Sequence, residues 1–207
     1  LPVDVNHSSW DHQILSSADQ QQPPIRLGLR LIKGLSEAAG QRVQAAQRLR
    51  PFANVADLRQ RACLDRGDME ALAAADALSG ISGNRYQSHW QTMALEDHRP
   101  LLPNEGAVRR SQDDAAITAA PTLPEDVIAD YQSTGLTLRS HPLSLLRHQP
   151  PFDRCRRQTE LEALGNHRFV RVAGLVTCRQ RPGTASGVVF LTLEDETGNI
   201  NVIVWPA

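Results

Sequence analysis

Long apolar runs and cysteines are scarce in this chain, and each shortage excludes a class of protein. No segment stays apolar over the roughly 20 residues that a membrane-spanning helix needs. Residues 1–4, Leu-Pro-Val-Asp, do not resemble the start of a signal peptide. The three cysteines, Cys63, Cys155 and Cys178, are far apart and odd in number, so they predict neither a disulfide framework nor a metal site. We therefore expect a cytoplasmic protein without a membrane partner.

Lysine is scarcer still, because Lys33 is the only lysine among the 22 basic residues. The net charge of −1 neither favours nor excludes a nucleic-acid partner, but the distribution of charge is uneven. Eight basic and two acidic side chains give residues 26–61 a net charge of +6, and residues 139–181 also carry +6. Residues 96–130 between them carry −5. Two basic blocks separated by an acidic one predict two contact surfaces and a spacer.

The segment Leu-Ile-Lys-Gly-Leu-Ser at residues 31–36 lies in the first basic block and precedes a predicted helix over residues 36–49. Gly34 would allow a tight turn, and the free N–H groups of a helix start favour an anion such as phosphate. Lys33 adds a positive charge, and Arg42 follows on the helix. The pattern is typical of a helix-hairpin-helix element that holds a nucleic-acid backbone without reading its bases. Taken alone, it fits an ordinary helical corner with an exposed lysine better, so the rest of the chain must decide.

Further helices are predicted around this hairpin. Residues 25–31 alternate in polarity and suggest a short strand or extended arm, and a glutamine- and proline-rich stretch before them suggests a linker. Asn54 and Asp65 are expected to cap a second and a third helix, and Asn84 starts a fourth. Gly80 and Gly83 are expected to break the chain between the last two. The apolar stripe of the fourth helix is predicted to be core rather than a ligand site, and it consists of Tyr86, Trp90 and Met93.

The second half of the chain changes character. Residues 96–123 are predicted to be mostly loop, residues 126–133 a helix ended by Gly135, and residues 154–164 helical. His141, which opens another helix, is expected to be a turn or cap residue rather than a catalytic one. Residues 169–178, 188–193 and 199–205 are predicted strands. Three antiparallel strands match the opening meander of an OB-fold barrel, which needs five strands, so the barrel is predicted to be incomplete.

These segments, in this order, resemble the bacterial C-family DNA polymerases, which comprise the DNA polymerase III alpha subunits and their error-prone relatives. Residues 27–35, Leu-Gly-Leu-Arg-Leu-Ile-Lys-Gly-Leu, are similar to the segment that opens the tandem helix-hairpin-helix domain of that family. Residues 2–6, 74–78 and 140–143 are similar to further stretches of it. Ala75-Asp76-Ala77 and residues 96–102 resemble the error-prone branch, and no clamp-binding peptide follows them.

The resemblance implies an α+β multidomain fold, with a helical tandem helix-hairpin-helix unit followed by a truncated OB-fold β-barrel. It implies four regions: the end of the fingers or a linker (1–25), the tandem hairpins (26–95), a linker with helices (96–165) and an incomplete OB-fold (166–207). Asp76 places a carboxylate where the second hairpin would meet phosphate, so we expect that hairpin only to pack. The family's catalytic palm, with its Mg²⁺ ions, and its metal-binding PHP domain are not represented, so no catalytic residue, metal or cofactor is expected in this piece.

The function implied is the DNA-binding C-terminal region of an error-prone, translesion DNA-directed DNA polymerase that grips template–primer duplex and single strand. Its partners would be DNA and other proteins of the translesion complex, with any clamp contact indirect. An alternative is a stand-alone nucleic-acid-binding adaptor with hairpin and OB modules. The residues expected to contact DNA are Lys33, Gly34, Ser36 and Arg42 in the helical unit, and Arg171, Arg179, Arg181 and Phe190 in the strands.

Overall fold

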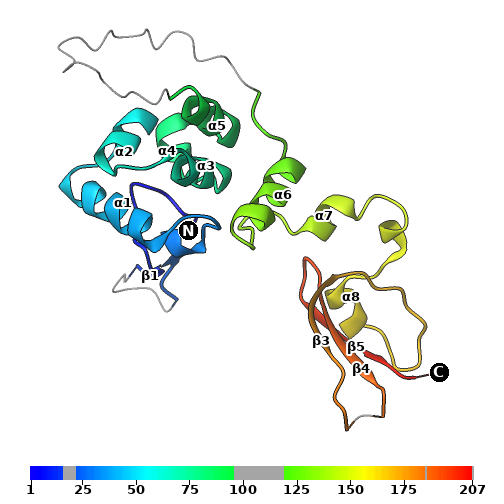
Figure 1. The fold of residues 1–207 in the computed structure, drawn as a ribbon. Coiled ribbons are helices and arrows are strands. Elements are labelled where there is room, and N and C mark those ends of the chain that lie inside the picture. Colours follow the sequence, from blue (N-terminus) through cyan, green and yellow to red (C-terminus); the bar gives the residue numbers. More distant parts are fainter. Residues whose placement is uncertain (16–21, 96–118, 185, 207) are drawn as a thin grey trace, which may run out of the picture. The chain divides into compact units, whose positions relative to one another are not determined.

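The computed structural model of the chain describes residues 1–15, 22–95, 119–184 and 186–206 (Figure 1). They form two compact units, residues 1–138 and residues 139–207. The first unit is helical and the second carries a three-stranded sheet, which confirms the predicted order of a helical region followed by strands. Most of residues 96–123, predicted to be loop, lie outside the described part of the chain.

Four of the short helices of this unit begin where the sequence predicts them, while the helix predicted over residues 126–133 begins earlier, at Leu123. Ser36, Asn54, Asp65 and Asn84 each accept a hydrogen bond from the backbone N–H three residues later, as N-cap residues do. The unit's elements are β1 (Gln13–Ile14), β2 (Ile25–Arg26), the 3-10 helix η1 (Leu29–Leu31), α1 (Glu37–Leu49), α2 (Val55–Arg61), α3 (Arg66–Ala74), α4 (Ser79–Ser82), α5 (Arg85–Met93) and α6 (Leu123–Ser133).

The core of this unit is built from small and medium apolar side chains. Helix α1 buries Ala39, Val43 and Ala46, and these small residues allow neighbouring backbones to approach closely. They pack in one cluster with fully buried Leu58 and Leu72. Leu49, which the helical periodicity places on the same face, is 84% exposed because α1 ends there, so that part of the prediction is wrong.

The N-terminal segment belongs to this core. Val3 and Val5 are buried in it, and the Val5 N–H donates to the Ala77 carbonyl at 3.0 Å. The Asn6 amide both donates to the Phe52 carbonyl (3.0 Å) and accepts from the Phe52 N–H (2.7 Å). Residues 3–6 are therefore a built-in part of the helical unit, whereas the sequence suggested only a linker or the end of another domain.

Helix α5 differs most from its prediction. The stripe expected in the core is exposed: Tyr86 by 38%, Trp90 by 57% and Met93 by 59%. Instead α5 buries Arg85, Ser88 and Thr92. The Arg85 guanidinium forms ion pairs with Asp126 and Asp130 of α6, and a charge so paired can be buried without a prohibitive desolvation cost.

The short strand expected within residues 25–31 is confirmed only in part, because these residues form the two-residue strand β2, paired with β1, and then the turn of η1. Gly80, expected to break the chain, lies inside the short helix α4, while Gly83 does end it with a φ of +105°.

The second unit contains α7 (Pro142–Leu146), the 3-10 helix η3 (Phe152–Arg154), α8 (Gln158–Glu162), β3 (Leu175–Gln180), β4 (Val189–Glu194) and β5 (Asn199–Val204). The strands are antiparallel in the order β3-β4-β5, with a bulge between Val176 and Cys178. Regular pairing begins only at Leu175, so the first strand is shorter than predicted. The described residues form an open sheet, and the predicted closure into an OB-fold barrel stays a prediction.

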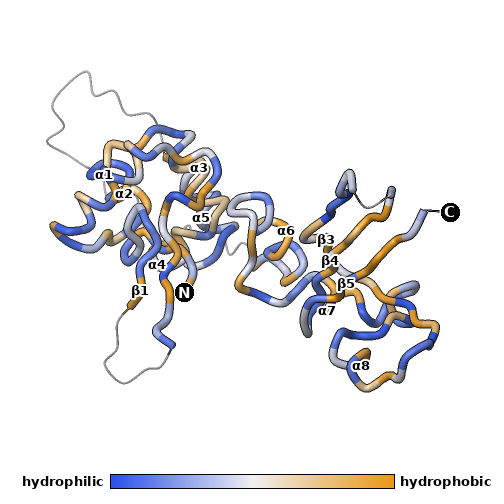
Figure 2. The backbone as a smooth tube through the Cα atoms, turned by 90° about the horizontal axis from the view of Figure 1, so that it is seen from below, coloured by the Kyte–Doolittle hydropathy of each residue, from blue (hydrophilic) through white to orange (hydrophobic). Residues whose placement is uncertain are grey.

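Side chains alternate between the two faces of this sheet. On β4, Val189, Leu191 and Leu193 share one face, while Phe190, Thr192 and Glu194 share the other. The first face continues on β5 through Ile200 and Val202, which pair with Leu193 and Leu191. Figure 2 shows the apolar character of β4 and β5. The sheet therefore has one apolar face and one mixed face.

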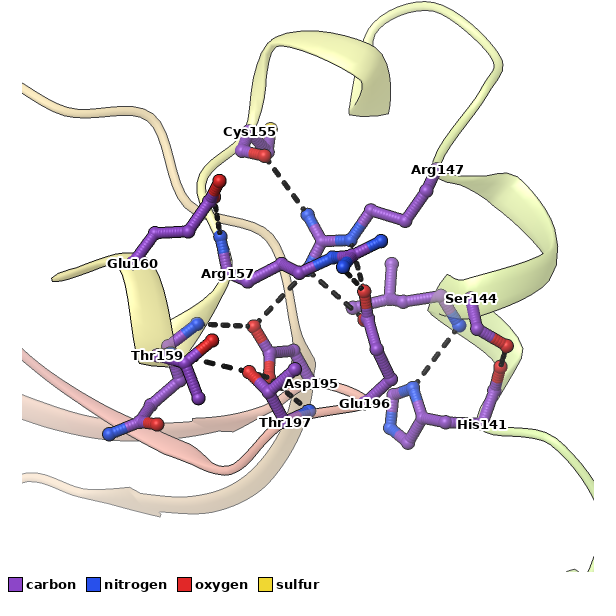
Figure 3. Close-up of polar contacts among 12 residues, drawn as sticks. His141, Ser144, Arg147, Cys155, Arg157, Thr159, Glu160, Asp195, Glu196 and Thr197 are labelled. Carbon is purple, nitrogen blue, oxygen red and sulfur yellow. Dashed lines mark hydrogen bonds and ion pairs between the residues drawn. The ribbon is translucent and has the colours of Figure 1, made fainter.

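Arg147 fixes the turn between β4 and β5 (Figure 3). Its guanidinium donates to Glu196 (2.8 Å), Asp195 (3.1 Å) and the Cys155 carbonyl (3.2 Å). Asp195 also accepts from the backbone N–H groups of Thr197, Gly198 and Gln158. His141 caps α7, because its Nδ1 accepts from the Leu143 N–H at 3.2 Å, which confirms the cap role expected for it.

Candidate nucleic-acid interface

The first hairpin is an exposed turn anchored by two buried side chains, Ile32 and Leu35. Gly34 has a φ of +87°, a left-handed conformation that side chains other than glycine rarely adopt. Leu35 is buried, and its N–H donates to the Ile32 carbonyl at 3.3 Å, which closes the turn. Lys33, Gly34 and Ser36 are exposed around it. The structure thus brings three of the predicted contact residues together on one surface loop.

Ser36 connects this turn to α1. Its hydroxyl oxygen accepts from the Ala39 N–H at 3.1 Å, so the helix starts immediately after the loop. The first N–H groups of a helix have no partner within the helix, and the helix dipole makes this end positive. Glu37, in the first turn, opposes this with a negative charge, and its carboxylate accepts from Gln41 at 2.9 Å. Lys33, Leu35 and Ala39 donate their N–H groups within the fold, so an anion at this helix start would bind other N–H groups of the stretch.

Lys33 has an additional structural role. Its ammonium group donates to the Tyr131 carbonyl at 2.9 Å, and its backbone N–H donates to the Ser133 carbonyl at 2.8 Å. Both carbonyls are in the last turn of α6, where the helix dipole favours a positive charge. An ammonium group has three donors, so the bond to Tyr131 leaves capacity for a phosphate oxygen. Lys33 therefore joins the hairpin to α6 while it remains exposed.

Arg42 holds α1 to its neighbours. Its Nε donates to the Ala62 carbonyl at 3.0 Å and its guanidinium lies 3.3 Å from the Asp68 carboxylate. Other arginines of the same basic block also form internal ion pairs, namely Arg30 with Asp11, and Arg50 and Arg61 with Asp57. Part of the +6 charge thus stabilises the fold, which the sequence pattern does not reveal. Contact of Arg42 with DNA stays a prediction.

The second hairpin has a left-handed turn residue at the same position as the first, but the residues that follow it are buried. Asp76 has a φ of +57° where the first hairpin has Gly34, and Ala77 follows as Leu35 does. Leu78 then stands at the helix N-cap position that Ser36 holds in the first hairpin, but it is fully buried and provides no capping side chain. The N-terminal segment covers this turn through the Val5–Ala77 hydrogen bond. The expectation that the second hairpin packs is confirmed.

The predicted contact residues of the sheet do not all share a face. Gln180, Phe190 and Ile203 are register partners and lie on one face, while Arg179 pairs with Leu191 on the other. Arg181 is exposed just after β3, and exposed Arg171 uses its carbonyl to accept from the Arg156 N–H. A single surface containing both Arg179 and Phe190 is therefore excluded by the alternation of the strand, although each contact stays a prediction by itself.

Sequence reasoning missed a cleft between α5 and α6. It has a volume of about 370 Å³, and its lining is mainly apolar. The residues that line it are Lys33, Ala74, Arg85, Tyr86, His89, Ala129, Gln132 and Ser133. Desolvation, together with the nearby carboxylate of Glu125, raises the pKa of the Tyr86 phenol. Because α5 and α6 are more than 25 positions apart in the chain, no local pattern places them together.

Comparison with known proteins supports the hairpin assignment. Residues 1–88 match the helix-hairpin-helix motif family. The chain is 50% identical to the error-prone DNA polymerase of Saccharophagus degradans over 208 aligned residues, which cover 99% of this chain and 20% of the relative. It is 49% identical to that of Teredinibacter turnerae, with the same coverage, and 46% identical to that of Ralstonia nicotianae, covering all of this chain and 19% of the relative.

The chain is homologous to a part of the error-prone DNA polymerases. It spans about one fifth of the length of these relatives. The resemblance read from the ordered segments is thereby confirmed. Within the described residues, none of the helices is long and apolar enough to cross a membrane.

Proposed function

We propose that this chain is the DNA-binding region of an error-prone DNA-directed DNA polymerase that acts in translesion synthesis. The observation that carries the proposal is the first hairpin: an exposed loop with Gly34 in the left-handed region, leading directly into the Ser36-capped start of α1. Such a loop can approach a phosphate closely with backbone N–H groups, and Lys33 adds an ammonium donor beside them. The hairpin would grip the backbone of the template–primer duplex.

Contacts of this kind are independent of base sequence. Backbone N–H groups and an ammonium group reach phosphate oxygens, which are the same at every nucleotide. A polymerase must move along any template, so sequence-independent contact suits it. The second hairpin would contribute packing instead, because its turn is buried beneath the N-terminal segment.

The sheet supports a second contact, to single-stranded template. Phe190 is 39% exposed on the mixed face beside Gln180 and Ile203, where a base can stack on its ring. Arg181, exposed after β3, supplies a positive charge for the backbone. This arrangement suits an OB-fold, whose remaining strands would close the barrel along the open edges of the sheet.

Nucleotide transfer would take place elsewhere in the parent polymerase. The chemistry requires Mg²⁺ held by palm carboxylates, so this piece would bind DNA without incorporating nucleotides. Its partners would be DNA and other proteins of the translesion complex, and its compartment the cytoplasm.

Salt dependence tests the hairpin. In Lys33→Ala, we expect the slope of log affinity against log salt for a fully paired duplex to fall by about 1, because one phosphate contact is lost. Lys33→Arg should restore the slope by restoring the charge. Fluorescence anisotropy of a labelled duplex from 50 to 300 mM salt provides the measurement.

Arg48→Ala is the matched control. It removes one positive charge from the last turn of α1, at the end opposite the hairpin, and should leave the slope unchanged. Equal slopes for Lys33→Ala and the unsubstituted chain would show that the first hairpin is not a phosphate site.

A further inference from the structure

The cleft between α5 and α6 has no role in the backbone contacts described above. We propose that it receives an unpaired nucleobase from the DNA strand whose backbone lies on the first hairpin. This inference rests on the proposed function, because the hairpin must bring the strand to the cleft. It adds a base-binding subsite to an element that otherwise contacts only phosphates.

The position of Lys33 links the two sites. Lys33 is part of the exposed hairpin and also lines the cleft, so a phosphate held at its ammonium group would place the attached nucleoside at the opening. The ammonium group gives this rim of the cleft a positive charge, which attracts the negatively charged phosphate.

The walls of the cleft suit a flat, apolar ligand with polar edges. Tyr86 and His89 are three positions apart on α5 and therefore lie on the same helix face. Both carry aromatic rings on which a base can stack. Ala74 and Ala129 have small side chains that leave the space between the walls open, and the exposed Gln132 amide offers both a donor and an acceptor to a base edge.

The carboxylate of Glu125 lies beside Tyr86, and desolvation together with this carboxylate raises the pKa of the Tyr86 phenol. Like any phenol, Tyr86 is neutral at physiological pH, so its ring does not repel a phosphate backbone. The Glu125 carboxylate accepts hydrogen bonds from the N–H and the hydroxyl of Thr122, which lower its pKa and hold it at the start of α6. The negative charge is thereby held at the start of α6 beside Tyr86, at the end of the helix opposite to Lys33.

The cleft is held in its open form before any ligand arrives. Arg85 joins α5 to Asp126 and Asp130 of α6, and Lys33 joins the hairpin to the last turn of α6. Both links are made by charged groups, and the Arg85 pairs are buried. A preformed site spends less of the binding free energy on ordering its own side chains. The volume of about 370 Å³ is at the small end of ligand pockets, which suits one base rather than a base pair.

The test compares two duplexes that differ by one extra, unpaired 2-aminopurine, an adenine analogue whose fluorescence changes on stacking. The full chain should bind the duplex with the unpaired base about tenfold more tightly than the fully paired one, in line with one base stacked on an aromatic side chain. The fluorescence of the unpaired 2-aminopurine should be strongly quenched when the chain binds this duplex. Ala129→Trp, which fills the cleft, should abolish the preference and the quenching while affinity for paired duplex is retained.

Ile128→Trp is the matched control, because it adds the same side chain at the neighbouring position of α6, which is 58% exposed and does not line the cleft. Ile128→Trp should keep both the preference for the duplex with the unpaired base and the quenching of 2-aminopurine. Gln132→Ala, at an exposed position, should reduce the preference several-fold without affecting the fold. If quenching persists in Ala129→Trp, or the unsubstituted chain shows no preference while it binds paired duplex, the base subsite is wrong. Failure to bind paired duplex at all would overturn the proposed function itself, and the subsite with it.

Discussion

Arg61 occupies the corner between α1 and α2. Its guanidinium donates to the carbonyls of Ala46, Arg50 and Pro51 and to the Asp57 carboxylate. It also stacks over Phe52, with 4.8 Å from the guanidinium carbon to the ring centroid. Three of these acceptors are backbone carbonyls at the end of α1 and just beyond it, where a positive charge is favoured. The charge of Arg61 therefore stabilises the chain reversal between α1 and α2. By sequence alone, Arg61 is only one of the eight basic residues in the first basic block.

We expect Arg61→Lys to lower the free energy of unfolding by about 2 kcal/mol. A lysine keeps the charge but lacks the planar, five-donor group that reaches several acceptors at once and stacks on a ring. Urea denaturation followed by circular dichroism measures the change. Arg48→Lys, an exposed substitution on the same helix, should stay within roughly 0.5 kcal/mol. A loss in Arg61→Lys no larger than in that control would mean that the contacts at this corner add little stability.

At the scale of single elements, the success of sequence reasoning depends on whether the signal is local. Ser36, Asn54, Asp65 and Asn84 cap their own helices, so the starting positions follow from a few neighbouring residues. The faces of α5 do not follow in this way. Its apolar stripe fits a buried face by periodicity, but α5 packs mainly against α3, α4 and α2, and the packing of these helices decides which face is covered. The buried ion pairs of Arg85 with Asp126 and Asp130 of α6 add a contact that the apolar pattern does not predict.

The turn between β4 and β5 depends on ionised carboxylates. Burial by itself favours the neutral form of Asp195, but the hydroxyl and N–H of Thr197 and the N–H groups of Gln158 and Gly198 together lower its pKa. Burial also favours the neutral form of Glu196. The Arg147 guanidinium outweighs the effect of burial and lowers the pKa of Glu196. Both carboxylates therefore titrate below their ordinary values in the folded state.

The sign of the pH effect follows from these lowered pKa values. The stabilisation is complete above the ordinary pKa values of 3.8 and 4.5 and is lost as the pH falls through the lower, folded-state values. Protection of β4 and β5 against hydrogen exchange in urea should thus decline below about pH 4. Asp195→Asn should cost roughly 3 kcal/mol at pH 7, since it leaves Arg147 with one buried partner fewer, and should show a smaller further loss in acid.

Asp153→Asn serves as the control for this turn. Asp153 is an exposed carboxylate of η3 in the same unit, so its substitution should reproduce the acid dependence of the unsubstituted chain. If Asp195→Asn shows the same acid loss as Asp153→Asn, the Arg147 cluster is not the origin of the effect.

At the scale of the whole molecule, the division into two units follows the contacts rather than composition. The predicted boundaries at residues 25, 95 and 165 follow from the family resemblance and stay predictions. By its contacts, the structure divides the chain near residue 138, and it places residues 3–6 in the helical core. Two valines and an asparagine give little local indication of burial, because their partners, Ala77 and Phe52, are more than 40 positions away. Long-range packing of this kind is not visible in a single sequence.

Deletion of residues 1–9 should therefore destabilise the helical unit. It removes Val3 and Val5, each worth about 1.5–3 kcal/mol when fully buried, and leaves the Ala77 carbonyl and the Phe52 backbone without their partners. Hydrogen exchange should show α1 to α5 losing most of their protection while β3 to β5 keep theirs. Equal protection of the helices with and without these residues would assign the segment to a neighbouring domain, as the sequence first suggested.

The single lysine of this 207-residue chain makes the hairpin chemically addressable. Among its side chains only Lys33 carries a primary amine. An amine-reactive dye or acetylating reagent would therefore modify one side chain, located where the hairpin, α6 and the cleft meet. The rate of that modification is a footprint of the site: duplex bound at the hairpin should shield Lys33, without any substitution in the protein.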